Sequence, residues 1–153
     1  MKITDMLRKD FIIEELQSKS KQEVLGELSS IFQKAGVRIE RDLVTKILME
    51  REKLGSTGIG DGIAIPHGKL AGLNDLMISF GRSREGIDFD SMDGKRVHLF
   101  FLLMAPENSA SLYLKTLAKI SKMLKDGTYR KQLMTARTKD EIYEVVSEKD
   151  DGC

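Results

Sequence analysis

The sequence has little that would form disulfides, carry a large net charge or span a membrane. Its only cysteine is Cys153, so no internal disulfide can form, which fits a reducing compartment. Lys and Arg total 25 and Asp and Glu total 24, so no basic excess indicates binding to nucleic acid or anionic lipid. No stretch approaches the ~20 apolar residues of a membrane helix. We therefore expect a cytoplasmic protein with no nucleic-acid partner and no direct membrane insertion.

The length and pattern of the chain predict one domain. A chain of 153 residues is long enough to build its own hydrophobic core, and no repeat or linker divides it. We predict a single domain over residues 1–153, with residues 150–153 as a flexible tail.

Apolar periodicity predicts helices at both ends of the chain and strands in the middle. Ser20 and Glu23 form a capping box for a first helix that ends at Gly36. The apolar run over 95–106 indicates a central strand in a sheet covered on both faces. The order of elements predicts an α+β domain with helices packed over a mixed sheet. The other expected elements are a helix over 40–55, strands over 11–15, 63–65 and 76–84, and three helical segments after 107 that break near Gly127 and Thr138.

The stretch GSTGIGDGIAIPHG, residues 55–68, combines five glycines with one of the two histidines. It matches none of the common phosphate motifs. Its central glycines form G-x-G-x-G rather than G-x-G-x-x-G, and they follow a helix instead of a strand. Five residues separate Gly62 from Gly68, and no Ser or Thr follows Lys69, so the P-loop pattern also fails.

Two interpretations of this stretch remain open. Glycines let the backbone approach an anion and turn its N–H groups toward it, and the two hydroxyls add donors. Pro66 stiffens the backbone before His67, which can act as a nucleophile when its second nitrogen is held by a hydrogen bond. Alternatively, the stretch is a glycine-rich turn with a structural histidine. The candidate phosphate-binding loop consists of Gly55, Ser56, Thr57, Gly58, Gly60 and Gly68.

Arg51 is the candidate partner of this loop. It continues the apolar stripe of Leu43 and Ile47 and lies one helical turn before Gly55, so we expect it to face the domain. A guanidinium group suits phosphate oxygens, although a structural ion pair or a solvent-directed side chain would fit the same position.

The second histidine, His98, lies inside the most apolar strand. No second metal ligand has suitable spacing to it, so we interpret it as structural and expect no metal site and no cofactor.

The segment REKLGSTGIGDGIAIPHGKL, residues 51–70, closely resembles the phosphorylation-site signature of enzyme IIA proteins of the fructose/mannitol type. These belong to the bacterial phosphoenolpyruvate-dependent phosphotransferase system, and the chain looks most like their nitrogen-regulatory members. The resemblance runs from ITDML near the N-terminus to DEIYEVV near the C-terminus. It implies a three-layer α/β/α domain with a central mixed sheet.

The resemblance also implies roles for individual residues. His67 would be the phosphoacceptor, taking its phosphoryl group from the phosphohistidine of a small phosphocarrier protein related to HPr, and Arg51 would stabilise the phosphate. Family members commonly have a second histidine beside the acceptor, where this chain has Tyr113. A phenol can donate one hydrogen bond to a phosphoryl oxygen but cannot carry positive charge. Tyr113 is therefore either a pocket residue or a core residue at the start of its helix.

Three functions follow from the resemblance. The first is a phosphotransferase component that acts as a phosphoryl-carrier regulator, whose phosphorylation state controls unidentified target proteins. The second is a sugar-specific IIA component that passes the group to a IIB domain for fructose or mannitol uptake. The third, of a different class, is a binding module that keeps the fold without being phosphorylated, which the presence of Arg51 and His67 argues against.

Overall fold

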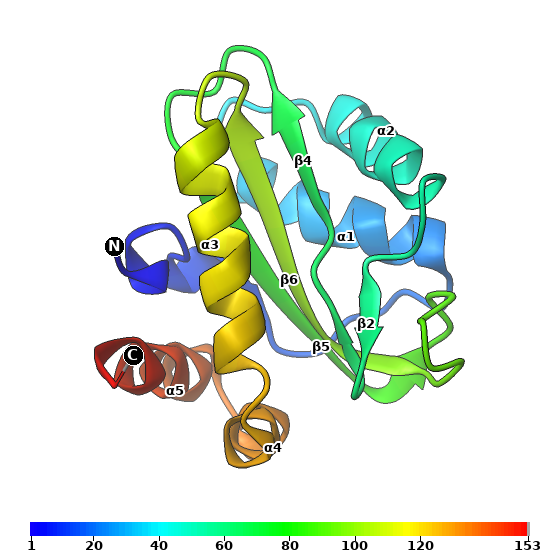
Figure 1. The fold of residues 1–153 in the computed structure, drawn as a ribbon, viewed down its shortest axis with the longest axis vertical. Helices are drawn as coiled ribbons and strands as arrows, with labels where there is room; N and C mark the ends of the chain where they lie inside the picture. The colour runs from blue at the N-terminus through cyan, green and yellow to red at the C-terminus, as the bar shows by residue number, and fades with distance from the viewer. Residues whose placement is uncertain (153) are drawn as a thin grey trace.

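The computed structural model describes residues 1–152, which fold around a mixed sheet (Figure 1). The strand order is β1-β5-β6-β3-β2, and β4 also pairs with β6. Strand β6 is antiparallel to β5 and parallel to both β3 and β4, while β1 is parallel to β5. The strands are β1 (Ile12–Ile13), β2 (Gly58–Gly60), β3 (Ile63–Ala64), β4 (His67–Leu70), β5 (Met77–Ile87) and β6 (Val97–Pro106).

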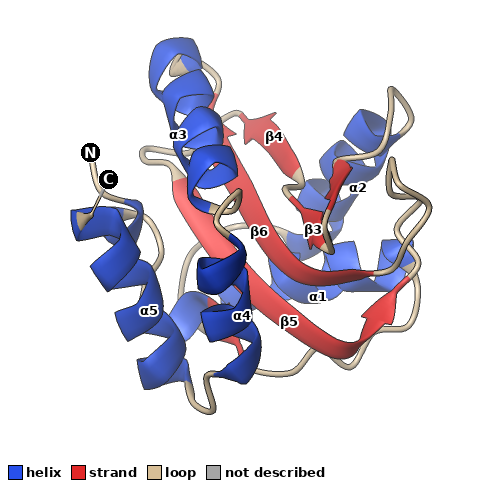
Figure 2. Cartoon of the chain, turned by 60° about the horizontal axis from the view of Figure 1, so that its bottom comes forward, coloured by secondary structure: helices blue, strands red, loops and turns tan. Residues whose placement is uncertain are grey.

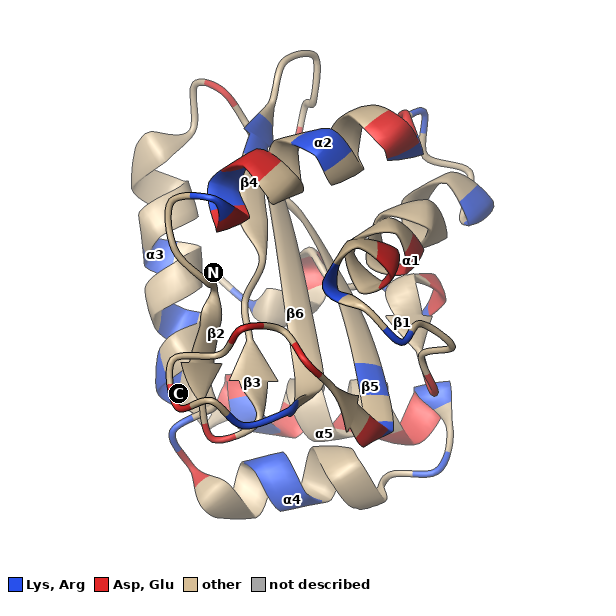
Figure 3. Cartoon of the chain, turned by 90° about the vertical axis from the view of Figure 1, so that its right-hand side faces the viewer, with Lys and Arg blue, Asp and Glu red and all other residues tan. Residues whose placement is uncertain are grey.

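Helices cover both faces of the sheet, which confirms the predicted three-layer α/β/α arrangement. Helices α1 and α2 lie on one side and α3 on the other (Figure 3), and α4 and α5 lie together at one end of the α3 layer (Figure 2). No helix within residues 1–152 is both long and apolar enough to cross a bilayer. The helices are α1 (Lys21–Lys34), α2 (Arg41–Glu52), α3 (Ala110–Met123), α4 (Gly127–Thr135) and α5 (Lys139–Asp151), preceded by 3-10 turns at Ile3–Asp5 and Lys9–Phe11.

The core forms along β6, as its composition predicted. Every residue of this strand is buried except the half-buried His98, because helices cover both of its faces. Phenylalanines from β5 and β6 meet edge to face, with ring centroids of Phe80 and Phe101 5.0 Å apart.

The capping residues predicted for the first helix are confirmed, whereas the end of the second helix differs from the prediction. The Ser20 hydroxyl accepts from the Glu23 backbone N–H, and Gly36 adopts φ +90° just after α1. Helix α2 ends at Glu52 rather than at Gly55. Strand β1 is shorter than expected and β2 was not predicted, because pairing between distant segments decides both.

One irregularity in the sheet positions the residues discussed below. Strands β3 and β4 lie on the same edge of β6 in the same register, with Ala64 opposite Phe100 and His67 opposite Leu103. Between them, Pro66 accepts a hydrogen bond from Leu103 N–H at 2.9 Å but has no N–H to donate. The ladder is therefore interrupted immediately before His67.

The two ends of the described chain are held together by Asp150. Its carboxylate accepts from the backbone N–H groups of Ile3 at 3.0 Å and Thr4 at 2.9 Å, and it pairs with Lys119 Nζ at 2.9 Å. The expectation of a flexible tail over 150–153 is thus wrong for Asp150 and Asp151, which belong to α5 because these contacts order the helix end. Cys153 lies outside the described residues.

We predict that Asp150→Asn destabilises the fold by about 1.5–3 kcal/mol at pH 7, because hydrogen bonds to a charged group are lost. Burial raises the pKa of Asp150, but hydrogen bonds from Lys119, Ile3 and Thr4 lower it more, so it lies below the ordinary 3.8. This stabilisation is therefore present above about pH 4 and is lost as the pH falls through the folded-state pKa.

Urea unfolding of the wild type and the variant at pH 7 and at about pH 3 measures both effects. The neighbouring Asp151→Asn, which removes an exposed pair with Lys2, is the control and should change stability little. Equal stability of Asp150→Asn and the wild type at pH 7 would contradict the prediction.

Candidate functional site

His67 is the first residue of β4 and is half-buried. Its Nδ1 lies 2.7 Å from the carbonyl oxygen of Ile65. Because a carbonyl oxygen only accepts, Nδ1 carries the proton and the lone pair of Nε2 is available. The ring is therefore held in the tautomer that a nucleophilic Nε2 requires.

Arg51 faces this free nitrogen from the last turn of α2. Its Nε donates to His67 Nε2 at 3.3 Å, and its Nη1 donates to the carbonyl oxygen of Gly55 at 2.8 Å. The predicted orientation of Arg51 toward the domain is thus correct, although Leu43 on the same expected stripe is 44% exposed.

Close packing of α2 on β4 brings these two side chains together. A Cβ at Gly68 would lie only 2.8 Å from Ile47 Cγ2, so a larger residue there would push the helix away from the strand. Gly68 thus serves helix–strand packing.

The protonation of His67 is controlled by its surroundings. Burial, the largest effect, lowers its pKa below the ordinary 6.5, and the charge of Arg51 lowers it further. Two weaker effects raise the pKa of His67: the hydrogen bond to Ile65, which is smaller than the effect of burial but larger than that of Arg51, and the charge of Glu52, which is the smallest of the four. The imidazole therefore remains neutral near pH 7, as a nucleophile must.

Tyr113 lies beside His67 at the start of α3, with the ring centroids 5.8 Å apart in an edge contact. It is 9% exposed, so the position combines the two alternatives that the sequence left open: it is buried and it lines the site. Burial raises the pKa of Tyr113 to about 12, which keeps the phenol neutral. Within residues 1–152 its hydroxyl has no hydrogen-bond partner.

Lys69 is a site residue that the sequence reasoning missed. Its Nζ lies 5.3 Å from the centroid of the Tyr113 ring, and it is two residues after His67 on β4, so both side chains point to the same face of the sheet. That spacing was the available signal once 67–70 was known to be a strand.

The hydroxyls of the glycine stretch are not free to bind an anion, contrary to expectation. Ser56 Oγ donates to the carbonyl oxygen of Phe89 at 2.9 Å. Thr57 donates both its backbone N–H, at 3.1 Å, and its hydroxyl to the Glu52 carboxylate. Because these donors are already used, the two residues hold the loop in place.

Two further glycines of the stretch serve the backbone geometry. Gly60 adopts φ +101°, which other residues rarely accept. A Cβ at Gly58 would lie 3.0 Å from the Cα of Ser91, so the loop before β6 packs directly on β2. The glycines therefore permit close packing and a sharp turn rather than forming a row of free N–H groups.

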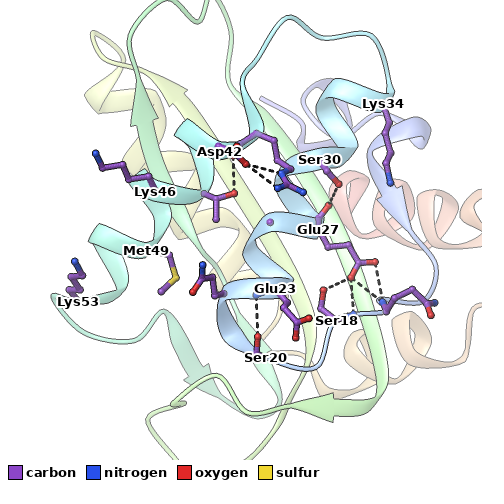
Figure 4. Close-up of a pocket in the computed structure, with 15 residues that line it drawn as sticks. Ser18, Ser20, Glu23, Glu27, Ser30, Lys34, Asp42, Lys46, Met49 and Lys53 are labelled. Atoms are coloured by element: carbon purple, nitrogen blue, oxygen red, sulfur yellow. Dashed lines mark hydrogen bonds and ion pairs between the residues drawn. The ribbon is translucent and has the colours of Figure 1, made fainter.

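A surface groove of about 1060 Å³ lies elsewhere, between α1 and α2 (Figure 4). Its lining is polar and of mixed charge, and it includes neither His67 nor Arg51. Glu27, one of its acidic residues, accepts from the backbone N–H groups of Gln17 and Ser18. Because this carboxylate holds the chain segment before α1, we assign no ligand to the groove.

Comparison with known proteins identifies the family. A family model described as "Phosphoenolpyruvate-dependent sugar phosphotransferase system, EIIA 2" matches residues 5–149. The chain belongs to this family. Membership of the EIIA 2 family places it among the phosphotransfer components of that system.

Individual relatives of this EIIA 2 protein include nitrogen regulatory proteins and fructose-specific components of the phosphotransferase system. It is 42% identical over 147 residues to a nitrogen regulatory protein of Bradyrhizobium diazoefficiens, covering 96% of this chain and 95% of that one. It is 39% identical over 150 residues to a fructose-specific EIIABC component of Bacillus subtilis, covering 98% of this chain but only 24% of that larger protein. The crystal structure of IIA-Ntr from Neisseria meningitidis superimposes with a TM-score of 0.86 at 34% identity, covering 94% and 98% of the two chains.

The other histidine of this EIIA 2 domain is placed differently. His98 Nδ1 lies 2.9 Å from the carbonyl oxygen of Ser83 in the neighbouring strand. Over residues 1–152, no cluster of three or more His, Cys, Asp or Glu could hold a metal. His98 therefore joins β6 to β5, as a structural histidine would.

We predict that His67 titrates below pH 6.5 and that Arg51→Ala raises its pKa. The cation disfavours imidazolium, so its removal eases protonation, while burial still keeps the pKa below the ordinary value. NMR titration of the imidazole carbon-bound protons measures this directly, because the chain has only two histidines. A His98→Gln variant assigns the signals, and a His67 pKa at or above 6.5 in the wild type would contradict the prediction.

Proposed function

We propose that this EIIA 2 protein is a phosphoryl-carrier regulator in which Nε2 of His67 accepts a phosphoryl group from the phosphohistidine of an HPr-like phosphocarrier. The observation that carries the proposal is the pair of contacts on one imidazole. Ile65 holds the proton on Nδ1, and Arg51 faces the lone pair of Nε2. A histidine that served packing alone would not need a cation at its unprotonated nitrogen.

The transfer step needs only groups that these residues and the donor supply. The Nε2 lone pair forms a bond to phosphorus while the phosphorus–nitrogen bond of the donor breaks, and the electron pair of that bond stays on the donor imidazole. The Nδ1 proton remains on His67. Positive charge then stabilises the three phosphoryl oxygens, because catalysis of this transfer depends mainly on positioning and electrostatics.

Arg51 suits this role because, within residues 1–152, only one of its terminal nitrogens donates a hydrogen bond. Nη1 is held by the Gly55 carbonyl oxygen, which fixes the guanidinium plane while Nε can move from Nε2 to a phosphoryl oxygen. The Tyr113 ring contacts His67, and Lys69 Nζ lies 5.3 Å from the centroid of that ring; we propose that the ammonium and phenol groups approach the other phosphoryl oxygens.

Regulation would follow from the added charge. A phosphoryl group brings about −1.5 to −2 charges at pH 7, which changes the surface around His67 and so the partners that bind there. The similarity to nitrogen regulatory proteins supports this use. We propose that the protein acts in the cytoplasm, where the phosphocarrier and the unidentified target proteins would meet it.

The main alternative is a sugar-specific component that passes the group to a IIB domain. The 39% identity to a fructose-specific EIIABC component favours it, whereas Tyr113 offers no positive charge to assist onward transfer. Transfer of labelled phosphate from this protein to a purified fructose or mannitol IIB domain would favour the transport function, and its absence would favour regulation.

We predict that His67→Ala abolishes phosphorylation while the fold persists. The test is incubation with labelled phosphoenolpyruvate, enzyme I and phosphocarrier protein, followed by a search for acid-labile, base-stable phosphate on this chain. His98→Ala is the control and should still be phosphorylated, because the His98 imidazole bonds to the Ser83 carbonyl oxygen and has no hydrogen bond to His67 or Arg51 within residues 1–152. Phosphate uptake by a folded His67→Ala variant would remove His67 from the acceptor role.

We predict that Tyr113 sets the lifetime of the phosphorylated form. Tyr113→Phe should shorten its half-life about 2- to 12-fold, the equivalent of a lost hydrogen bond of about 0.5–1.5 kcal/mol. Tyr113→His should lengthen it below about pH 7, where the imidazole becomes cationic, and the gain should shrink at higher pH.

The measurement is the half-life of phosphorylated wild type, Phe and His variants at several pH values. Tyr143→Phe, which removes a phenol hydroxyl from α5, is the matched control. Superimposable curves for all three Tyr113 forms would mean that this residue does not touch the phosphate.

A further inference from the structure

Two charged residues near the site stand at helix ends that disfavour them. Lys21 is the first residue of α1 and Glu52 is the last residue of α2, whereas helix dipoles favour acids at the start of a helix and bases at its end. They pair with each other, with Lys21 Nζ 2.8 Å from Glu52 Oε1, and their side chains are only 16% and 3% exposed. Local helix preference does not explain this pair, so its contacts must.

The Glu52 carboxylate holds the loop that follows its own helix. It accepts both donors of Thr57, the backbone N–H at 3.1 Å and the hydroxyl. Lys21 Nζ lies 2.8 Å from Glu52 Oε1 and 4.7 Å from the centroid of the Phe89 ring. Glu52 is thus a buried acceptor whose hydrogen-bond partners come from α1 and the glycine stretch.

From Thr57, hydrogen bonds continue to the imidazole. The Thr57 carbonyl oxygen accepts from Ile65 N–H at 3.1 Å, and the Ile65 carbonyl oxygen accepts from His67 Nδ1 at 2.7 Å. The backbone N–H of Ile65 is therefore held by Thr57, and its carbonyl oxygen is held by His67. A shift of Thr57 would move the carbonyl that determines which nitrogen of His67 carries the proton.

We propose that Glu52 is a positioning residue for His67: it fixes Thr57 and, through the backbone of Ile65, keeps the imidazole in the Nδ1–H tautomer with Nε2 directed at Arg51. Its effect on phosphorylation rests on the function proposed above, but its effect on the tautomer does not. Glu52 itself has no contact with His67 among the hydrogen bonds of residues 1–152.

The chain offers a chemically matched control at its termini. The buried Asp150 carboxylate accepts from two backbone N–H groups, from the Thr4 hydroxyl and from Lys119, so Asp150→Asn removes the same kind of network as Glu52→Gln. The ends of the chain and β4 lie on opposite sides of α3 in Figure 1. Any general loss of stability should appear in both variants.

The experiment measures the tautomer of His67 by long-range ¹H–¹⁵N NMR of the full-length protein at about pH 8, where the His67 imidazole is neutral because its pKa is lowered below 6.5. We expect the wild type to be mainly Nδ1–H. Glu52→Gln should raise the ratio of Nε2–H to Nδ1–H by about threefold or more, since the hydrogen-bond network that favours one form is weakened. Asp150→Asn should leave the ratio unchanged, and His98 provides an internal reference in every spectrum.

A second pair of variants keeps the test decisive if Glu52→Gln does not fold. Thr57→Val removes only the hydroxyl donor and should shift the ratio in the same direction. Thr57→Ser keeps both donors and should retain the wild-type ratio. An unchanged His67 tautomer in folded Glu52→Gln, or in Thr57→Val where Glu52→Gln does not fold, would overturn the proposal.

Phosphorylation rates separate this proposal from the proposed function. With enzyme I and the phosphocarrier, Glu52→Gln should be phosphorylated about tenfold more slowly than the wild type, and Asp150→Asn at the wild-type rate. A wild type that is never phosphorylated, together with a shifted tautomer in Glu52→Gln, would refute the function and leave the positioning role supported. A normally phosphorylated Glu52→Gln with an unshifted tautomer would refute the positioning role alone.

Discussion

The hydrogen bond between His67 Nδ1 and the Ile65 carbonyl oxygen, 2.7 Å long, is the interaction on which the site depends. It exists because the pairing along one edge of β6 is interrupted at Pro66, which has no N–H to donate. On either side of Pro66, β3 and β4 pair with β6 in the same register. The imidazole therefore bonds to a carbonyl only two residues before it. Arg51 contacts Nε2, the ring nitrogen that this bond leaves free.

The electrostatics of the site combine a fixed cation with a neutral phenol. Arginine is always protonated in proteins, and Tyr113 with its pKa raised to about 12 stays neutral. Of these three side chains only His67 can gain a charge in mildly acidic solution, and with its pKa lowered below 6.5 it stays neutral near pH 7. A second imidazole at position 113 would have made the charge around the acceptor depend on pH as well, so this chain has a simpler pH response than one with paired histidines.

Sequence reasoning was most successful where the signal is local. Hydrophobic periodicity and caps located α1 and α2, and the apolar run located β6. The same periodicity placed Arg51 correctly toward the domain, because residues one helical turn apart share a face. The importance of position 67 followed from its neighbours in sequence, the glycines and Pro66.

The parts that could not be predicted depend on contacts between distant segments. Ser56 and Thr57 look like free donors until Phe89 and Glu52 are placed beside them. In the sequence Glu52 looks like an ordinary helix residue, because its structural role depends on an ion pair with Lys21 of another helix. The strand β2 could not be foreseen because glycine-rich segments have low strand propensity, and its formation depends on pairing with β3.

The joining of the chain ends through Asp150 has a consequence for how such a domain can be combined with others. Ile3 and Thr4 bond directly to a residue in the last turn of α5, so the polypeptide enters and leaves the fold at nearly the same place. Neighbouring ends allow a domain to be inserted into a longer polypeptide without opening its sheet. A domain attached at either end would start beside α5, on the opposite side of α3 from β4 (Figure 1).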